Sequence, residues 1–298
     1  MSKILFSAIY VVTILSTINS FAVSPDRDSN KPVEPRLISL GGGVTEILFA
    51  IEMGKYVVGV DASSSYPPKV KSLPQVAYHR RLSAEGIISL QPSMVIATTE
   101  AGPPEVLQQL RDADVELIIL PHEPTIDSTL EKIKLIGEAV HAQSQATNLI
   151  NKITLDIDSL LTHNIPDSLT AKVLFLYARG QGNIMVAGTK TGANEIIKLA
   201  GAKNAISEFE GYKPLTSEAV IRSAPDVILL MDSGLQSLGG TNALWELPGM
   251  ALTPAKVKNR VLTMDGLLLL GFGPRIAEAA QSLHESLYPD STISTSGN

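Results

Sequence analysis

The fold is decided by STLEKIKLIGEAVHAQSQATNLINKITLDIDSLLTHN, residues 128–164, which interrupts an otherwise regular alternation of strands and helices. Apolar residues recur in this stretch at helical spacing, and it contains no proline. One face of its later part is marked by Leu149, Ile153, Ile157 and Leu160. A helix of about 20 residues there would span about 30 Å. The stretch therefore predicts a long helix that separates two parts of the chain.

Short β-like runs alternate with helical segments on both sides of this helix. Before it, the β-like runs are RLISL (36–40), KYVVGVD (55–61), MVIAT (94–98) and VELIILP (115–121). After it, they are AKVLFLYA (171–178), DVILLMD (226–232) and RVLTMD (260–265). Such a βαβ succession favours parallel sheets covered by helices. The predicted fold class is α/β, with two Rossmann-like α/β lobes joined by a single long backbone α-helix and a ligand cleft between the lobes.

The N-terminal residues have the pattern of an export signal. MSKILFSAIYVVTILSTINSFA has one lysine, then an apolar run too short and too interrupted for a membrane span, then Ser20 and Ala22 at the positions that signal peptidase reads. Cleavage after Ala22 predicts a periplasmic protein. The sequence has no cysteine, so we expect neither disulfides nor a lipid anchor.

These patterns predict the following organisation of the chain. The segments are a signal peptide (1–22), a flexible lead (23–35), an N-terminal α/β lobe (36–142), a linking helix (143–164), a C-terminal α/β lobe (165–288) and a flexible tail (289–298).

The composition excludes one class of partner. The chain has 298 residues, of which 44% are hydrophobic and 18% charged, as in a folded globular protein. Its net charge is −6 and its pI is about 5.4. A nucleic-acid-binding protein would need a broad basic face, so we expect no nucleic-acid partner.

A short repeat relates the two predicted lobes. Glu85 precedes Pro92 by seven residues, and Glu218 precedes Pro225 by the same spacing. Each glutamate lies early in a short predicted helix that the proline ends before a strand. Two lobes of like plan with a cleft between them are typical of ligand-binding proteins.

Signals of catalysis are weak. The sequence has no G-x-S-x-G elbow and no cysteine nucleophile, and its five histidines form no HxH or HExxH motif. We therefore expect a protein that is not an enzyme. A metal-dependent periplasmic hydrolase remains an alternative of a different class.

The sequence Tyr78-His79-Arg80-Arg81 is unusual in an acidic chain. In the simpler interpretation, Tyr78 is a half-buried loop aromatic and the arginines are solvated. In the functional interpretation, Tyr78 is a phenolate ligand of ferric iron, because iron(III) and a nearby cation both favour the phenolate. In an extended loop, Arg80 would project on the same side as Tyr78, and His79 and Arg81 would point elsewhere.

Several phrases together resemble a known family. They are SLGGGVTEIL, YHRRLSAEGIISL, TTEAGPPEVLQQLR, GYKPLTSEAV, GLQSLGG, LWELPGMALTPA and MDGLLLLGFGPR. With the long central helix, they resemble the periplasmic haem-binding proteins of bacterial haem ABC importers. These proteins belong to the helical-backbone (class III) substrate-binding proteins, which also include cobalamin and siderophore carriers. The resemblance runs from about Arg36 to Leu287.

The resemblance implies a function and a site. The protein would bind ferric haem (protoporphyrin IX) as its transported ligand, with Tyr78 as the axial metal ligand and Arg80 as its basic partner. His79 or a water would complete the coordination of the iron. A monomeric carrier would then deliver haem to an inner-membrane ABC permease/ATPase complex for iron uptake. Alternatives within the same class are a cobalamin or a ferric-siderophore carrier.

Other site residues follow from the same resemblance. Glu85 and Glu218 would be the two docking carboxylates, one on each lobe, that meet arginines of the permease. The carboxylates of haem need cations or hydrogen-bond donors, for which Arg179, Lys213 and Arg275 are candidates. The loop 177–189 contains no histidine that could supply a second axial ligand.

Overall fold

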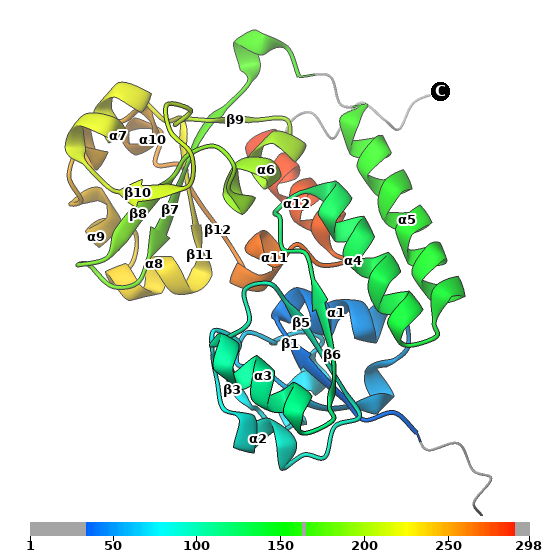
Figure 1. The fold of residues 1–298 in the computed structure, drawn as a ribbon. Helices are drawn as coiled ribbons and strands as arrows, with labels where there is room; N and C mark the ends of the chain where they lie inside the picture. Colours follow the sequence, from blue (N-terminus) through cyan, green and yellow to red (C-terminus); the bar gives the residue numbers. More distant parts are fainter. Residues whose placement is uncertain (1–33, 163–164, 290–298) are drawn as a thin grey trace, which may run out of the picture. The chain divides into compact units, whose positions relative to one another are not determined.

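The computed structural model describes residues 34–162 and 165–289 (Figure 1). The predicted leader, most of the predicted lead, the end of the predicted linking helix and most of the predicted tail lie outside the described residues: 1–22, 23–33, 163–164 and 290–298. The chain divides into the units Met1–Glu34 and Pro35–Asn298, and the second is described below. None of its described helices is long and apolar enough to cross a membrane.

The first lobe contains a four-stranded parallel sheet with the strand order β2-β1-β5-β6. Its strands are β1 (Leu37–Leu40), β2 (Val57–Val60), β5 (Met94–Thr98) and β6 (Glu116–Leu120). β1 and β5 are buried along their whole length, as is typical of parallel strands covered on both faces. The helical elements are α1 (Gly42–Ala50), η1 (Gly54–Tyr56), η2 (Pro68–Ser72), α2 (Ala84–Ile88), α3 (Pro104–Asp112) and α4 (Ile126–Ala139).

The strand-free stretch forms two helices that pack side by side (Figure 1). After α4, the chain turns at His141, which has a φ of 55°, and continues as α5 (Gln143–Leu161). The turn is tight, because a Cβ on Gly137 would lie 2.4 Å from the Cβ of Ala146. The 19 residues of α5 extend about 28 Å at 1.5 Å per residue, and the helix leads to the second lobe.

The second lobe contains a mixed sheet with the order β10-β8-β7-β11-β12, and β9 also pairs with β7. The strands are β7 (Lys172–Ala178), β8 (Ile184–Ala187), β9 (Lys203–Asn204), β10 (Tyr212–Pro214), β11 (Val227–Met231) and β12 (Val261–Met264). The helical elements are η3 (Asp167–Leu169), α6 (Gly192–Leu199), α7 (Ser217–Ser223), α8 (Asp232–Leu238), α9 (Thr241–Trp245), η4 (Met250–Leu252), α10 (Pro254–Val257), α11 (Gly266–Leu270) and α12 (Ile276–Leu287).

The antiparallel part of this sheet departs from the βαβ expectation. β8 pairs antiparallel with both β7 and β10, and the sequence analysis did not identify β8 as a strand. Only residues 179–183 connect β7 to β8. That connection is long enough for a hairpin, whereas a parallel pair needs a crossover of a dozen or more residues. The α/β class and the plan of two lobes with a linking helix are confirmed.

One apolar cluster is continuous between the lobes. It includes Ile47 of α1, Ile133 of α4, Ile153 of α5, Ile196 of α6 and Leu283 of α12. Full burial of such a side chain contributes about 1.5–3 kcal/mol. Figure 1 shows α12 beside α6 and near α5. The two lobes therefore share a layer of packed helices.

Polar contacts at the segment 271–275 reinforce this layer. A Cβ on Gly43 of α1 would lie 2.4 Å from the carbonyl oxygen of Gly271, so a side chain would not fit there. Glu46 of α1 forms an ion pair with Arg275, at the start of α12, and their side chains are 3% and 17% exposed. Helix α1 of the first lobe thus packs directly against the backbone of segment 271–275 of the second lobe.

Helix α4 also forms hydrogen bonds with segment 271–275. The Nζ of Lys132 donates a hydrogen bond to the carbonyl oxygen of Phe272 at 3.0 Å. The Oγ1 of Thr129 donates to the same oxygen at 3.2 Å. These contacts place α11 and the segment after it at the base of the space between the lobes.

Candidate ligand-binding cleft

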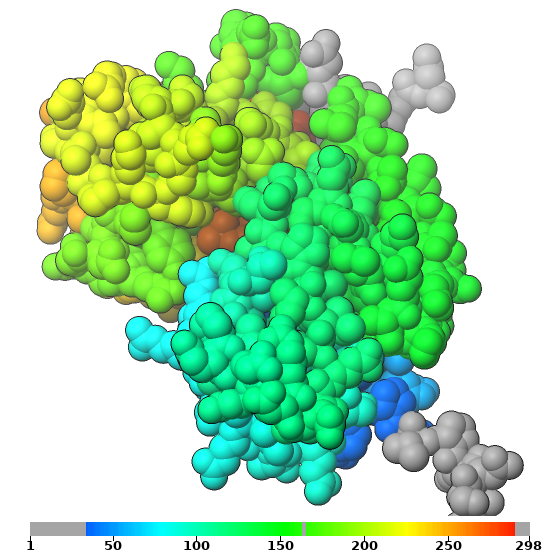
Figure 2. Space-filling view, in the orientation of Figure 1, coloured from blue at the N-terminus to red at the C-terminus, as the bar shows by residue number. Residues whose placement is uncertain are grey.

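A cleft with a volume of about 830 Å³ lies between the two lobes. Figure 2 shows a notch in the surface there, with atoms in the orange of α11 at its bottom. The first lobe contributes loops that follow β1, β2, β5 and β6, and the second contributes residues on or after β7, β8 and β11. Carboxyl ends of parallel strands are where open α/β sheets bind ligands.

Tyr78 is presented to the cleft by a small hairpin. β3 (Ala77–Tyr78) pairs antiparallel with β4 (Arg81–Leu82), and residues 79–80 form the turn between them. Tyr78 is 36% exposed and lines the cleft, as do His79 and Arg80. The expectation that His79 points elsewhere was wrong. It assumed an extended loop, whereas the turn brings the rings of Tyr78 and His79 to 4.3 Å between centroids.

A buried carboxylate orients His79. Asp61 has no exposed surface, and its Oδ2 lies 2.8 Å from Nδ1 of His79. Asp61 also accepts hydrogen bonds from the backbone N–H of Gly41 at 2.9 Å and from the hydroxyls of Ser63 and Ser64. Burial alone would raise the pKa of Asp61, but the hydrogen bonds from His79, Ser63 and Gly41 lower it below its usual value.

The Asp61 contact determines what His79 can do in the cleft. A proton on Nδ1 directed at a carboxylate leaves Nε2 of a neutral ring as an acceptor or a metal ligand. This Nε2 lies 3.9 Å from the carboxylate of Glu100. His79 can therefore offer one nitrogen lone pair to a ligand.

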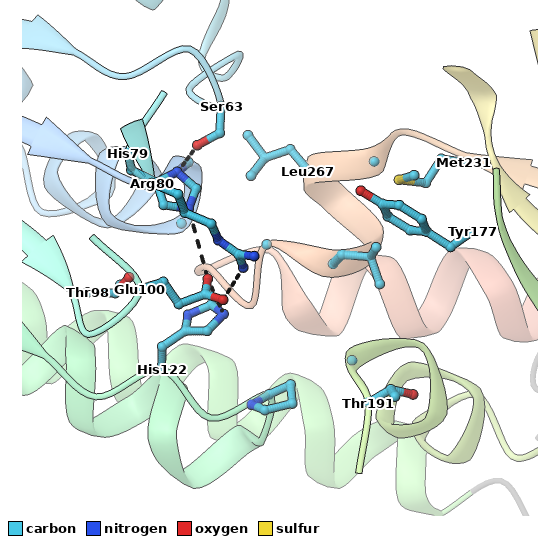
Figure 3. Close-up of a pocket in the computed structure, with 18 of the residues that line it drawn as sticks. Ser63, His79, Arg80, Thr98, Glu100, His122, Tyr177, Thr191, Met231 and Leu267 are labelled. Carbon is cyan, nitrogen blue, oxygen red and sulfur yellow. Dashed lines mark hydrogen bonds and ion pairs between the residues drawn. The ribbon is translucent and has the colours of Figure 1, made fainter. Parts of the chain in front are cut away.

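Glu100 is a site residue to which the sequence analysis assigned no role. It follows β5, and its carboxylate forms an ion pair with Arg80 and lies 3.0 Å from Nε2 of His122 (Figure 3). A sequence signal existed, because TTE follows directly on the apolar run MVIA, where a parallel strand ends. Nothing in the sequence, however, pairs residue 100 with residues 80 and 122.

Two further cationic or titratable groups line the cleft. Lys132 is 2% exposed, and burial lowers its pKa to about 8, although the charge of Glu100 opposes the shift. Burial likewise lowers the pKa of His122, against the charge of Glu100. The Nδ1 of His122 is buried and, among the described residues, has no hydrogen-bond partner.

The charges that line the cleft are mostly positive. The described lining residues include four cations, which are Arg80, Lys132, Arg179 and Lys190, and one carboxylate, Glu100. With neutral histidines, the sum is 4 − 1 = +3, whereas the whole chain carries −6. A cleft with low-dielectric walls and this charge attracts an anionic ligand.

The second lobe supplies an apolar and aromatic wall. Its residues are Tyr177, Met185, Tyr212, Met231, Leu267 and Leu270. Figure 3 shows Tyr177, Met231 and Leu267 across the cleft from Arg80 and Glu100. The rings of Tyr177 and Tyr212 are 5.9 Å apart, edge to face, and the guanidinium of Arg179 lies 5.2 Å from the Tyr177 ring centroid. Burial raises the pKa of Tyr212 to about 12, so its phenol is neutral at pH 7.

Arg275 does not line this cleft. Its Nε lies 3.2 Å from Oε2 of Glu46, and its guanidinium stacks on the ring of Tyr66 at 3.8 Å. A guanidinium neutralised in this way is a poor partner for a ligand carboxylate. Arg179, by contrast, lies in the cleft wall as the sequence-based hypothesis requires.

Glu85 and Glu218 occupy equivalent positions on the two lobes. Each is the second residue of a short helix, α2 or α7, and each is exposed. Glu218 forms an exposed pair with Arg222 at 3.3 Å. Three residues after each glutamate, Ile88 and Ile221 are 38% and 44% exposed. Each lobe thus presents a carboxylate beside a small apolar spot on a helix surface.

The fold and the cleft define a protein that captures a ligand between two lobes. The chain belongs to the periplasmic binding protein family, whose model matches residues 37–267. A relative at 30% identity, over 91% of this chain and 87% of its own, is the uncharacterized ABC transporter substrate-binding lipoprotein YvrC of Bacillus subtilis. A vitamin B12-binding protein of Pectobacterium carotovorum is 27% identical, over 85% of this chain and 88% of its own.

Solved structures confirm the resemblance to periplasmic haem-binding proteins. The periplasmic heme-binding protein RhuT of Roseiflexus sp. RS-1 is 42% identical, with a TM-score of 0.83 over 86% of this chain and 99% of its own. HutB of Vibrio cholerae, also a periplasmic heme-binding protein, is 34% identical, with a TM-score of 0.80 over 86% of this chain and all of its own.

Proposed function

We propose that the protein is a periplasmic carrier of ferric haem that has no catalytic activity of its own. The observation that carries the proposal is the Tyr78 hairpin at a cleft whose described lining is net cationic and whose second-lobe wall is apolar and aromatic. Haem is a flat aromatic ring with two carboxylates and, in its ferric form, a metal that binds phenolate. The similarity to haem-binding proteins supports the same ligand.

Several residues of the cleft have distinct roles in this proposal. Tyr78 is the axial ligand, and its neighbour His79, oriented by Asp61, is available as a second donor to the iron or to a bound water. Arg80 and Arg179 lie on opposite lobes and are suited to pair with the two ligand carboxylates. Tyr177 and Met231 provide contact surface for the ring.

Cobalamin is the alternative ligand that the relatives support, because several of them are vitamin B12-binding proteins. Titration of the mature protein with hemin and, separately, with cyanocobalamin tests the choice, with the absorption spectrum of the ligand as the readout. We expect a shifted haem spectrum that saturates with hemin and no change with cyanocobalamin. Saturable binding of cyanocobalamin without a response to hemin would overturn the proposal.

A metal-dependent hydrolase has less support. Among residues 34–162 and 165–289 there is no group of three or more His, Asp or Glu side chains placed to hold a metal ion. Metal analysis of the purified protein tests this alternative, which stoichiometric zinc or manganese would favour.

We further propose that Glu85 and Glu218 dock the carrier on the membrane permease. The support is their equivalent exposed positions, one on each lobe, each beside an exposed isoleucine. A charge on the rim of an interface sets orientation and association rate more than affinity for the cargo.

Charge reversal tests the docking proposal. We expect Glu85→Lys combined with Glu218→Lys to reduce the carrier-stimulated ATPase rate of the reconstituted cognate transporter by more than about tenfold, since like charges across an interface repel. Hemin affinity should stay within about twofold of wild type. Glu105→Lys, at an exposed position in the first turn of α3, is the matched control and should change neither quantity. A loss of hemin binding in the double variant would contradict the docking role.

Delivery from the periplasm as a lipid-free monomer stays a prediction. The relative YvrC is a lipoprotein, so the mode of attachment differs among similar proteins. The intact mass of the exported protein and its size in solution test both points.

A further inference from the structure

Glu100 pairs with the guanidinium of Arg80, which is one of the cations that line the cleft and that an anionic ligand would also bind. Its side chain is 29% exposed and lines the cleft on the loop after β5. Its Oε1 pairs with the guanidinium of Arg80, and its Oε2 lies 3.0 Å from Nε2 of His122 and 3.9 Å from Nε2 of His79. One carboxylate thus bridges three positively charged or titratable side chains (Figure 3).

Among the described residues that line the cleft, Glu100 is the only carboxylate that can pair with these cationic or titratable side chains. The charge of Glu100 also acts on Lys132, whose pKa it raises against the effect of burial. Asp61, a buried acid of the same lobe that does not line the cleft, already accepts hydrogen bonds from Gly41, Ser63 and His79. Glu100 therefore offsets part of the positive charge that lines this side of the cleft.

We propose that Glu100 competes with the carboxylates of the ligand for Arg80, so that it weakens binding and speeds release. A planar guanidinium has five N–H donors and can pair with a carboxylate through either of two edges, and Nη2 of Arg80, which donates to Glu100, belongs to both edges. A ligand carboxylate that binds Arg80 must therefore displace Glu100 or share the guanidinium with it. The contribution of Arg80 to the free energy of binding is then the difference between two similar ion pairs. This inference rests on the proposed function, because it requires a ligand with carboxylates.

Such competition suits a carrier that has to release its ligand after binding it. Tight capture and rapid delivery conflict, and an internal carboxylate that re-forms its pair with Arg80 lowers the barrier to release. The opposite role predicts an effect of the opposite sign. If Glu100 instead orients Arg80 toward the ligand, removal of its charge would weaken binding. The sign of the effect separates the two roles.

The test is the rate of hemin transfer from the protein to excess apomyoglobin, followed by the absorption change, for wild type and Glu100→Gln. We expect Glu100→Gln to slow hemin release by at least about tenfold, the effect of one charge-assisted hydrogen bond. The release of hemin dimethyl ester, which has no free carboxylates, should be the same in both proteins. Glu105→Gln, on the exposed face of α3, is the control and should match wild type with both ligands.

Two further variants test whether the effect of Glu100 depends on its pair with Arg80. In an Arg80→Gln background, Glu100→Gln should no longer slow release, because the contested guanidinium is gone. Should Glu100→Gln fail to fold, Glu100→Asp, which retains the charge but shortens the reach to Arg80, should slow release in the same direction and by less. Unchanged or faster hemin release, or equal slowing with the dimethyl ester, overturns the inference while leaving the proposed function intact. A wild-type protein that binds no hemin overturns both.

Discussion

The Tyr78→Phe protein is expected to lose the ferric haem spectrum of wild type and to bind hemin more than about 100-fold less tightly. The substitution keeps the ring at the hairpin and removes only the hydroxyl that would coordinate iron. Loss of an outer-shell partner of a metal ligand already costs about 10- to 100-fold in affinity, so loss of the ligand itself should cost more. Spectra and titrations at equal hemin concentration measure the effect.

Tyr66→Phe is the matched control for this experiment. Tyr66 belongs to the same lobe and is 42% exposed, close to the 36% of Tyr78, but it does not line the cleft. Its hemin spectrum and affinity should equal those of wild type. If Tyr78→Phe also retains both, Tyr78 is not the iron ligand, and His79 becomes the leading candidate because Asp61 already orients its Nε2.

The second large effect concerns stability. Arg275→Met should lower the free energy of unfolding by about 3–5 kcal/mol, because it leaves Glu46 buried and without its cation. The side chain of Glu46 is 3% exposed, and burial already raises its pKa despite the hydrogen bond from Arg275. Without Arg275, the carboxylate must either stay charged in an apolar site or take up a proton. Urea unfolding at pH 7 measures the loss.

Two comparisons separate the buried pair from a general effect of charge. Adding Glu46→Gln to Arg275→Met removes the uncompensated charge and should restore at least about 2 kcal/mol. Lys152→Ala breaks an exposed i,i+4 pair with Asp156 and should cost less than about 0.5 kcal/mol. A loss below about 1 kcal/mol in Arg275→Met would mean that this interlobe pair contributes little to the fold.

Much of the cleft could be anticipated from the sequence because its signals are local. Tyr78, Arg80 and Arg179 were singled out by residue type and motif, and all three line the cleft. The hairpin that presents Tyr78 was not predicted, because two-residue strands carry too little periodicity. Arg275 was selected as a cation in a family motif, and the structure pairs it with Glu46, which lies 229 residues away in the chain.

The sequence by itself determined the α/β plan of two lobes around a linking helix, since alternating β-like runs on both sides of one long helical stretch allow few architectures. It also determined the equivalent positions of Glu85 and Glu218, because each follows from the order of helix, proline and strand. Only the tertiary structure decided how the charges pair. Glu100 pairs with Arg80 and His122, and Arg275 pairs with Glu46 instead of lining the cleft, because the free energy of a charge depends on distance and burial in space. Neither quantity can be read from separation along the chain.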